Sequence, residues 1–170
     1  SYDYLNMTYL EDKSAIFAIR NRWESYSNCT FYGAGMPKRT QCGIFNLNTN
    51  DWIDIKQFRY KKKPNNNAFT CSVCYDKDDM IYIFDHAMNY TSKYDLHKNE
   101  WYTLSKDNSM HYYGELAFSV FWYNDYILYG LSYVSNETIG KDFRHQLNTL
   151  DLRDNNRKWV MTGIAFDGMA

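Results

Sequence analysis

One short phrase occurs three times along the chain, and this repeat constrains the fold more than any other feature. The phrase consists of a large apolar residue, Asn or Asp, Leu, a polar run and then Trp, at residues 45–52, 94–101 and 150–159. Asn tolerates the left-handed backbone of a tight turn, and Leu and Trp supply apolar surface for packing. Repeats of about 40 to 50 residues built from short strands indicate a β-propeller rather than a helical solenoid.

The middle unit shows the expected four strands of a propeller blade most clearly. Residues 80–84 (MIYIF) are almost wholly apolar, as expected for a strand buried on both faces. The sequence predicts the other strands of this unit at residues 68–75, 92–96 and 101–104. The same order predicts strands of the third unit at residues 115–122, 126–130, 146–152 and 159–162. In the first unit, strands are expected at residues 14–19, 29–33, 42–47 and 52–55.

The whole chain, residues 1–170, is therefore predicted to be an all-β protein made of four-stranded antiparallel blades. Its blades are expected at about residues 14–56, 65–105 and 112–162. Residues 1–12 are expected to finish a preceding blade, and residues 163–170 to begin a further one. Three blades form a partial propeller with open edges. Two copies closing one ring, or the remainder of a longer chain, would cover those edges.

The arrangement resembles the kelch repeat family over roughly residues 14–162. The residues that carry the resemblance are the apolar strand MIYIF and the phrase YDLHKNEW, with its Tyr-Asp pair and its Trp after a short turn. The Gly pair that ends the second strand of a kelch blade is replaced by Asp85-His86 in the second unit and by Gly130-Leu131 in the third. The resemblance implies a degenerate kelch array of about three blades.

Long connections are expected on one face of this propeller, where the second strand leads to the third and the fourth leads to the next blade. They comprise residues 34–41, 85–91, 131–145, 56–67 and 105–114. Tyr and Arg anchor protein interfaces, so basic and tyrosine residues in or beside these loops predict a partner-binding face. The candidate residues are Lys38, Arg39, Arg59, Tyr60, Lys61, Lys62, Lys63, Tyr90, Tyr112, Tyr113, Tyr133 and Arg144. The alternative is that these charged loops are simply solvated.

The bulk charge excludes some functions. With 19 basic and 20 acidic residues the chain is close to neutral, and it lacks a recognised nucleic-acid module, so nucleic acid is not an expected partner. Its histidines fall in separate loops or turns, and no catalytic triad, phosphate loop or paired-carboxylate motif is present. We therefore expect no enzymatic activity, no metal site and no cofactor.

The cysteines and the glycosylation sequons leave two compartments open. Cys29 and Cys42 flank an expected hairpin and could form a disulfide, or both could be half-buried thiols. Asn89 and Asn136 lie in sequons within expected loops, where a glycan is accessible. Against secretion, neither a signal peptide nor a disulfide framework is visible, and no apolar run is long enough to span a membrane. An intracellular, cytoplasmic location is favoured over an extracellular one.

The preferred function is protein–protein interaction, in which the long-loop face binds a partner with an acidic segment. The kelch resemblance implies further roles, such as selecting substrates for a ubiquitin-ligase adaptor or binding actin. The abundance of Asn, Lys, Tyr and Asp suits AT-rich genomes, including those of large DNA viruses that encode BTB-kelch proteins, which implies a role in host–virus interaction. The rival reading is an extracellular, glycosylated adhesion or receptor-contact domain. A copper oxidase is a third class implied by kelch-like propellers.

Overall fold

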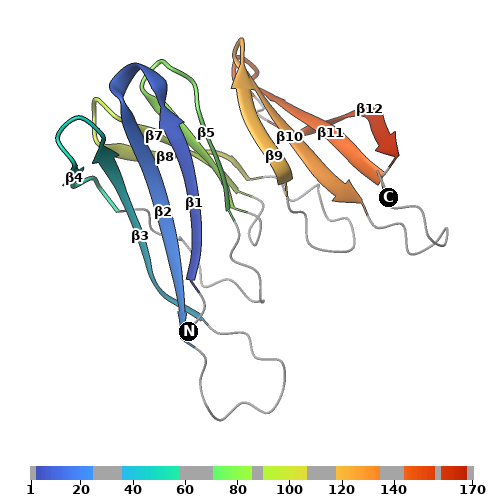
Figure 1. Cartoon of the computed structure of the whole chain (residues 1–170). Helices are drawn as coiled ribbons and strands as arrows, with labels where there is room; N and C mark the ends of the chain where they lie inside the picture. Colours follow the sequence, from blue (N-terminus) through green and yellow to red (C-terminus); the bar gives the residue numbers. More distant parts are fainter. Residues whose placement is uncertain are drawn as a thin grey trace.

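The computed structural model describes residues 3–24, 36–57, 71–85, 90–106, 118–134, 144–155 and 158–167. Strands β1 to β12 make up three four-stranded antiparallel sheets, and a three-residue 3₁₀ helix, η1, accompanies them (Figure 1). The predicted all-β class, with four antiparallel strands in each unit, is therefore confirmed.

Sheet 1 contains the N-terminal strand that we assigned to a preceding blade. Its strands follow the order β1 (Asp3–Leu10), β2 (Ala15–Glu24), β3 (Met36–Asn46) and β4 (Asp51–Ile53), with η1 (Glu11–Lys13) between β1 and β2. The assignment was wrong because β1 pairs along its whole length with β2, from Asp3 opposite Arg22 to Leu10 opposite Ala15. Residues 14–19 thus lie in the second strand of this sheet, while residues 29–33 fall outside the described part of the chain.

Sheet 2 matches the prediction for the middle unit closely. Its strands are β5 (Cys71–Tyr75), β6 (Met80–Asp85), β7 (Tyr90–Asp95) and β8 (Glu100–Lys106), paired in this order. The apolar strand β6 lies between β5 and β7, and residues 81–84 are all buried. This burial explains why MIYIF contains hardly any polar side chain.

Sheet 3 includes the residues that we expected to begin a further blade. Its strands are β9 (Phe118–Asn124), β10 (Ile127–Val134), β11 (Arg144–Asp151) and β12 (Val160–Asp167). Residues 163–167 belong to β12, whose pairing with β11 continues to Asp167 opposite Arg144. The pairing register shifts between Gln146 and Asn148, and Gly163 has a φ of 77°. This irregularity lets one strand continue where the sequence suggested a break.

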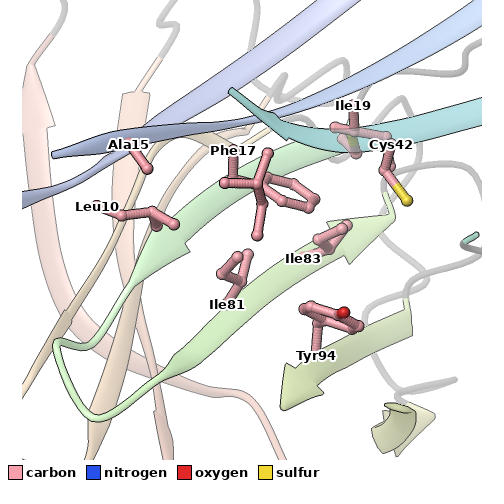
Figure 2. Packing of buried hydrophobic residues seen from close by; sticks show 10 residues of the cluster. Leu10, Ala15, Phe17, Ile19, Cys42, Ile81, Ile83 and Tyr94 are labelled. Carbon is pink, nitrogen blue, oxygen red and sulfur yellow. The ribbon is translucent and has the colours of Figure 1, made fainter. Parts of the chain in front are cut away.

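The three sheets pack in sequence order, as consecutive blades of a propeller do. Their first strands, β1, β5 and β9, lie beside one another. One buried cluster joins sheets 1 and 2, and Figure 2 shows Phe17 of β2 directed toward Ile81 and Ile83 of β6. A second cluster joins sheets 2 and 3 through Phe84 and Leu128, among others. Each sheet is therefore stabilised by burial of apolar surface against its neighbour.

The Asn or Asp of the repeated phrase holds the turn that follows the third strand of each sheet. Its Oδ1 atom accepts the backbone N–H two residues further along, at 2.8 Å for Asn46, 3.0 Å for Asp95 and 2.9 Å for Asp151. Asn50 and Asn99, later in two of these turns, have φ values of 59° and 52°. The predicted use of asparagine for left-handed turn backbone is confirmed at these two positions.

The Leu of the phrase ties this turn to the turn between the first and second strands. In each sheet its backbone N–H donates to a carbonyl in that first turn at 2.9 Å, with the donor–acceptor pairs Leu47–Ser14, Leu96–Asp79 and Leu152–Tyr126. All three acceptor residues have positive φ. The same backbone arrangement therefore recurs in all three sheets.

The Trp of the phrase packs against the preceding sheet in two of the three units. Trp101 donates its Nε1–H to the carbonyl of Lys56 at 2.7 Å and lies edge-on to Phe17, with 6.4 Å between ring centroids. Trp159 donates to Oγ1 of Thr91 at 2.8 Å and lies edge-on to Phe84. The predicted role of these residues in packing is confirmed for both.

Candidate partner-binding surface

The predicted partner-binding residues that the structure describes all lie at one end of the sheets. We call this end the strand-end face: it is where the second strand of each sheet ends and the third begins. The register places Arg39 there in sheet 1, Tyr90 in sheet 2 and Arg144 in sheet 3, and Lys38 and Tyr133 adjoin them. The remaining candidates lie outside the described residues, namely Arg59, Tyr60, Lys61, Lys62, Lys63, Tyr112 and Tyr113.

Several segments that we expected to be loops at this end are strand. Lys38 and Arg39 lie within β3, β10 continues to Val134, and β8 continues to Lys106. Their backbone groups pair with the neighbouring strand, which the polar composition of these segments did not suggest. The candidate residues that the structure describes thus lie on strands rather than in loops.

Two arginines occupy paired register positions at the strand-end face of sheet 1. Arg22 of β2 lies opposite Arg39 of β3, and Asp3 of β1 lies on the other side of Arg22. In sheet 2, Lys106 lies opposite Tyr90 at the same end.

The opposite end, which we call the turn face, is rich in acid. Figure 1 shows its β1–β2 and β9–β10 turns at the upper edge. Among the described residues its carboxylates are Glu11, Asp12, Asp51, Asp76, Asp78, Asp79, Asp95, Glu100, Asp125, Asp151 and Asp154, and its basic residues are Lys13, Lys77, Lys98, Arg153 and Lys158. Among the described residues the charge is therefore uneven: carboxylates predominate at the turn face, whereas basic residues lie together with Asp3, Glu24, Asp85 and Asp167 at the strand-end face.

Many of the turn-face carboxylates already have partners within the protein. Asp12 accepts a hydrogen bond from the Tyr75 hydroxyl at 2.8 Å, which lowers the pKa of Asp12. The Arg153 guanidinium binds Asp151 through Nε at 2.9 Å and Nη2 at 2.8 Å, and lowers the pKa of Asp151 to about 2. Asp79 forms an ion pair with Lys13 and also contacts the neighbouring imidazole of His97. This end uses its charge chiefly to hold turns and adjacent sheets together.

Asp76 is a buried carboxylate of the turn face. Its Oδ1 accepts the backbone N–H groups of Asp78 and Met80, at 2.8 and 3.0 Å, and its Oδ2 accepts the Tyr82 hydroxyl at 2.8 Å. Burial raises the pKa of Asp76 despite these bonds. Because these bonds come from its own turn and from the adjoining strand β6, Asp76 is a structural residue.

The two histidines that the structure describes lie at opposite ends of the sheets. His97 lies in a turn on the turn face, as predicted, and His145 lies opposite Tyr133 at the strand-end face. His86 and His111 fall outside the described residues. Within the described ranges, no group of three His, Cys, Asp or Glu residues is placed to hold a metal ion.

The cysteines that the structure describes, Cys42, Cys71 and Cys74, are all buried. Cys71 packs into the cluster between sheets 1 and 2, and Cys74 into the cluster between sheets 2 and 3, so this CxxC pair faces opposite ways as expected for a strand. Burial raises the pKa of the Cys74 thiol, which makes it unreactive. Cys42 is also buried and lies opposite Ile19, and the disulfide considered between Cys42 and Cys29 stays a prediction. Cys29 itself lies outside the described residues.

Two further predictions concern the cellular compartment. The sequon residues Asn89 and Asn136 fall outside the described part of the chain. In the described part, no helix has the length and apolar composition needed to cross a bilayer.

A second surface, which the sequence analysis did not identify, consists of two open apolar sheet faces. On sheet 1 it is a row across all four strands, Tyr9–Ile16–Phe45–Trp52, in which Trp52 is 63% exposed. On sheet 3 it is the row Trp122–Tyr129–Thr149–Val160, in which Val160 is 58% exposed. The sequence did contain a signal for the open row on sheet 1. Trp101 and Trp159 pack on the preceding sheet, whereas Trp52, the first copy of the repeated Trp, is exposed.

Comparison with known proteins adds no family assignment. Neither a scan against models of protein families nor a search of curated proteins found a match to this chain. The kelch family thus remains a resemblance carried by the repeat itself.

Proposed function

We propose that the chain is a protein-binding module whose strand-end face contacts an acidic segment of a partner protein. The observation that supports this most is the register, which brings Lys38, Arg39, Tyr90, Tyr133 and Arg144 from three sheets to the same end. Basic and aromatic residues together suit an acidic peptide, because Arg forms bidentate bonds with carboxylates and Tyr offers rigid amphipathic surface.

The uneven distribution of charge predicts which end of the sheets an acidic partner would bind. The acid-rich turn face would repel an acidic partner, whereas the strand-end face would attract it. The orientation of the bound partner would therefore follow from charge, and its binding would weaken as salt screens that charge. We assign no catalytic step to the module.

The kelch resemblance suggests a cellular setting for such binding. A module of this kind would select the substrate of a ubiquitin-ligase adaptor, or a host protein if the chain belongs to a virus. An intracellular location fits this setting, and the buried thiol of Cys74 fits a reducing compartment. The adaptor itself would be supplied by another domain or protein.

A second candidate is an extracellular adhesion or receptor-contact domain, which rests on the sequons at Asn89 and Asn136. Intact mass of the native protein separates it from the first: glycans on either residue would favour the extracellular function. Metal analysis after growth in copper-replete medium tests whether the chain is a copper oxidase. Bound copper would support that function.

Binding to acidic peptides tests the main proposal directly. Short random peptides displayed on phage are selected on the unmodified chain, and the enriched peptides should be acidic. A variant with Arg39, Lys61, Lys62 and Lys63 replaced by Ser should then bind a synthetic copy of the best peptide roughly thirtyfold more weakly. Four ion pairs with the peptide at about 0.5 kcal/mol each amount to about 2 kcal/mol.

The matched control removes basic charge from the other end. Lys77 and Lys98 lie in exposed turns of the turn face. Replacing both with Ser should leave the affinity for the peptide within about twofold. Equal loss in both variants would indicate a general charge effect, and no enrichment of acidic peptides would contradict the proposal. Affinity measured at two salt concentrations shows whether the loss depends on charge. The circular dichroism spectrum of each variant shows separately whether it is folded.

A further inference from the structure

The chain carries both halves of an interface that it already forms twice internally. The half that packs on a preceding sheet is the leading row, which runs across the four strands of a sheet. In sheet 2 it is Tyr75–Ile81–Tyr94–Trp101, and in sheet 3 it contains Tyr123, Leu128, Leu150 and then Trp159. The equivalent row of sheet 1 is Tyr9–Ile16–Phe45–Trp52. The same residue types therefore recur at the same register positions.

The leading rows of sheets 2 and 3 are covered by the sheet before them. Ile81 and Tyr94 are buried in the first cluster, and Leu128 and Leu150 in the second. In sheet 1 the row is open, with Tyr9 and Trp52 both more than half exposed. Trp52 lies over Gly43, where a Cβ would approach its ring to 3.0 Å, and packs on Phe45 with 5.3 Å between ring centroids. The exposed indole is thus held in place on its sheet.

The half that receives a leading row is the trailing row on the other face of a sheet. In sheet 2 it contains Tyr82, whose ring stacks on Tyr123 of sheet 3 at 5.8 Å between centroids. In sheet 3 the equivalent position is Tyr129, in the row Trp122–Tyr129–Thr149–Val160. Tyr129 stacks on Trp122 at 4.8 Å, and Trp122 and Val160 are exposed. This row is the open counterpart of the one on sheet 1.

We propose that a second copy of the chain covers both open rows, with the leading row of sheet 1 in each copy packed on the trailing row of sheet 3 in the other. Two such contacts related by a twofold axis would close a ring of six sheets. Propellers typically have 4 to 8 blades, so this number can close. Closure would remove two aromatic surfaces from water, as the two internal contacts do. The inference concerns assembly and does not depend on the proposed peptide-binding function.

Two variants and their mixture test this arrangement. Trp52→Glu places a charge on the leading row and Val160→Glu places one on the trailing row, and each should turn a particle of two 20.4 kDa chains into a monomer. Mixing the two variants leaves one unmodified contact per pair, so the mixture should recover dimer that neither variant forms alone. Light scattering over a concentration series measures the mass. Asn48→Glu, in an exposed turn of sheet 1, is the control and should remain dimeric.

Each other result would overturn the proposal. A monomeric unmodified chain at tens of micromolar would leave the rows to a different occupant, including further sheets of a longer polypeptide. A dimer that Val160→Glu leaves intact would show that sheet 1 pairs with sheet 1. Long polymers would show contacts that do not close. Because Trp52 packs on its own sheet, Met7→Glu, at an exposed residue on the same face, repeats the test without removing the indole.

Discussion

Replacing Trp159 with Ala is expected to lower the free energy of unfolding by about 3–5 kcal/mol. Trp159 is only 5% exposed, lies edge-on to Phe84 of the preceding sheet, and donates its indole N–H to Thr91 at 2.8 Å. Truncation would leave a cavity between sheets 2 and 3 and an acceptor without its donor. Urea denaturation followed by far-ultraviolet circular dichroism measures the change.

Two smaller substitutions divide this effect into packing and hydrogen bonding. Thr91→Val keeps the shape of the side chain but removes the acceptor, and should cost about 1–2 kcal/mol because the indole N–H stays buried without a partner. Trp159→Phe should fall between Thr91→Val and Trp159→Ala. If Trp159→Ala changed stability by less than about 1 kcal/mol, Trp159 would not lie between two packed sheets.

Replacing Phe17 with Ala should have a similar effect, about 3–5 kcal/mol, at the contact between sheets 1 and 2. Phe17 is fully buried, is directed toward the β6 residues Ile81 and Ile83, and lies edge-on to Trp101 (Figure 2). The same denaturation experiment applies. Tryptophan fluorescence should also change, since Trp101 loses an aromatic neighbour.

Phe17→Leu is the matched control for this contact. It retains most of the apolar volume and should cost less than about 1.5 kcal/mol. Equal effects of the Ala and Leu variants would indicate that the loss comes from a changed strand rather than from a cavity. A small effect of Phe17→Ala together with a large effect of Trp159→Ala would mean that sheet 1 does not pack on sheet 2 as described.

The sequence predicted the middle sheet well because its local signals agree. The apolar run of β6 is bounded by a turn of aspartates, and the phrase from Tyr94 to Trp101 contains the cap Asp95 and the left-handed Asn99 within a few residues. Hydrophobic pattern, turn chemistry and strand length all predicted the same element. The pairing partners of these strands therefore followed from chain order alone.

The first and last sheets were harder because their strands extend through polar residues. β2 continues to Glu24 and β3 begins at Met36, although this part of the sequence is rich in basic and polar side chains. Pairing between the strands stabilises such segments whatever their composition, and a single sequence does not show that pairing. The irregularity near Gly163 likewise concealed the full length of β12.

The candidate site was predicted as a set of residues on one face, and the register supports that placement for Lys38, Arg39, Tyr90, Tyr133 and Arg144. The open apolar rows were not predicted. An exposed Trp52 and a buried Trp159 occupy the same place in the repeated phrase, and only the packing of the sheets distinguishes them. Burial between distant segments is a tertiary property that local patterns do not encode.

Hydrogen exchange with and without the best acidic peptide is the most direct test of binding at the strand-end face. The proposal predicts slower exchange of backbone amides at the starts of β3, β7 and β11, with the turns at residues 76–79 and 96–99 unchanged. Slower exchange confined to the turn face, or no change at the strand-end face of any sheet, would contradict it.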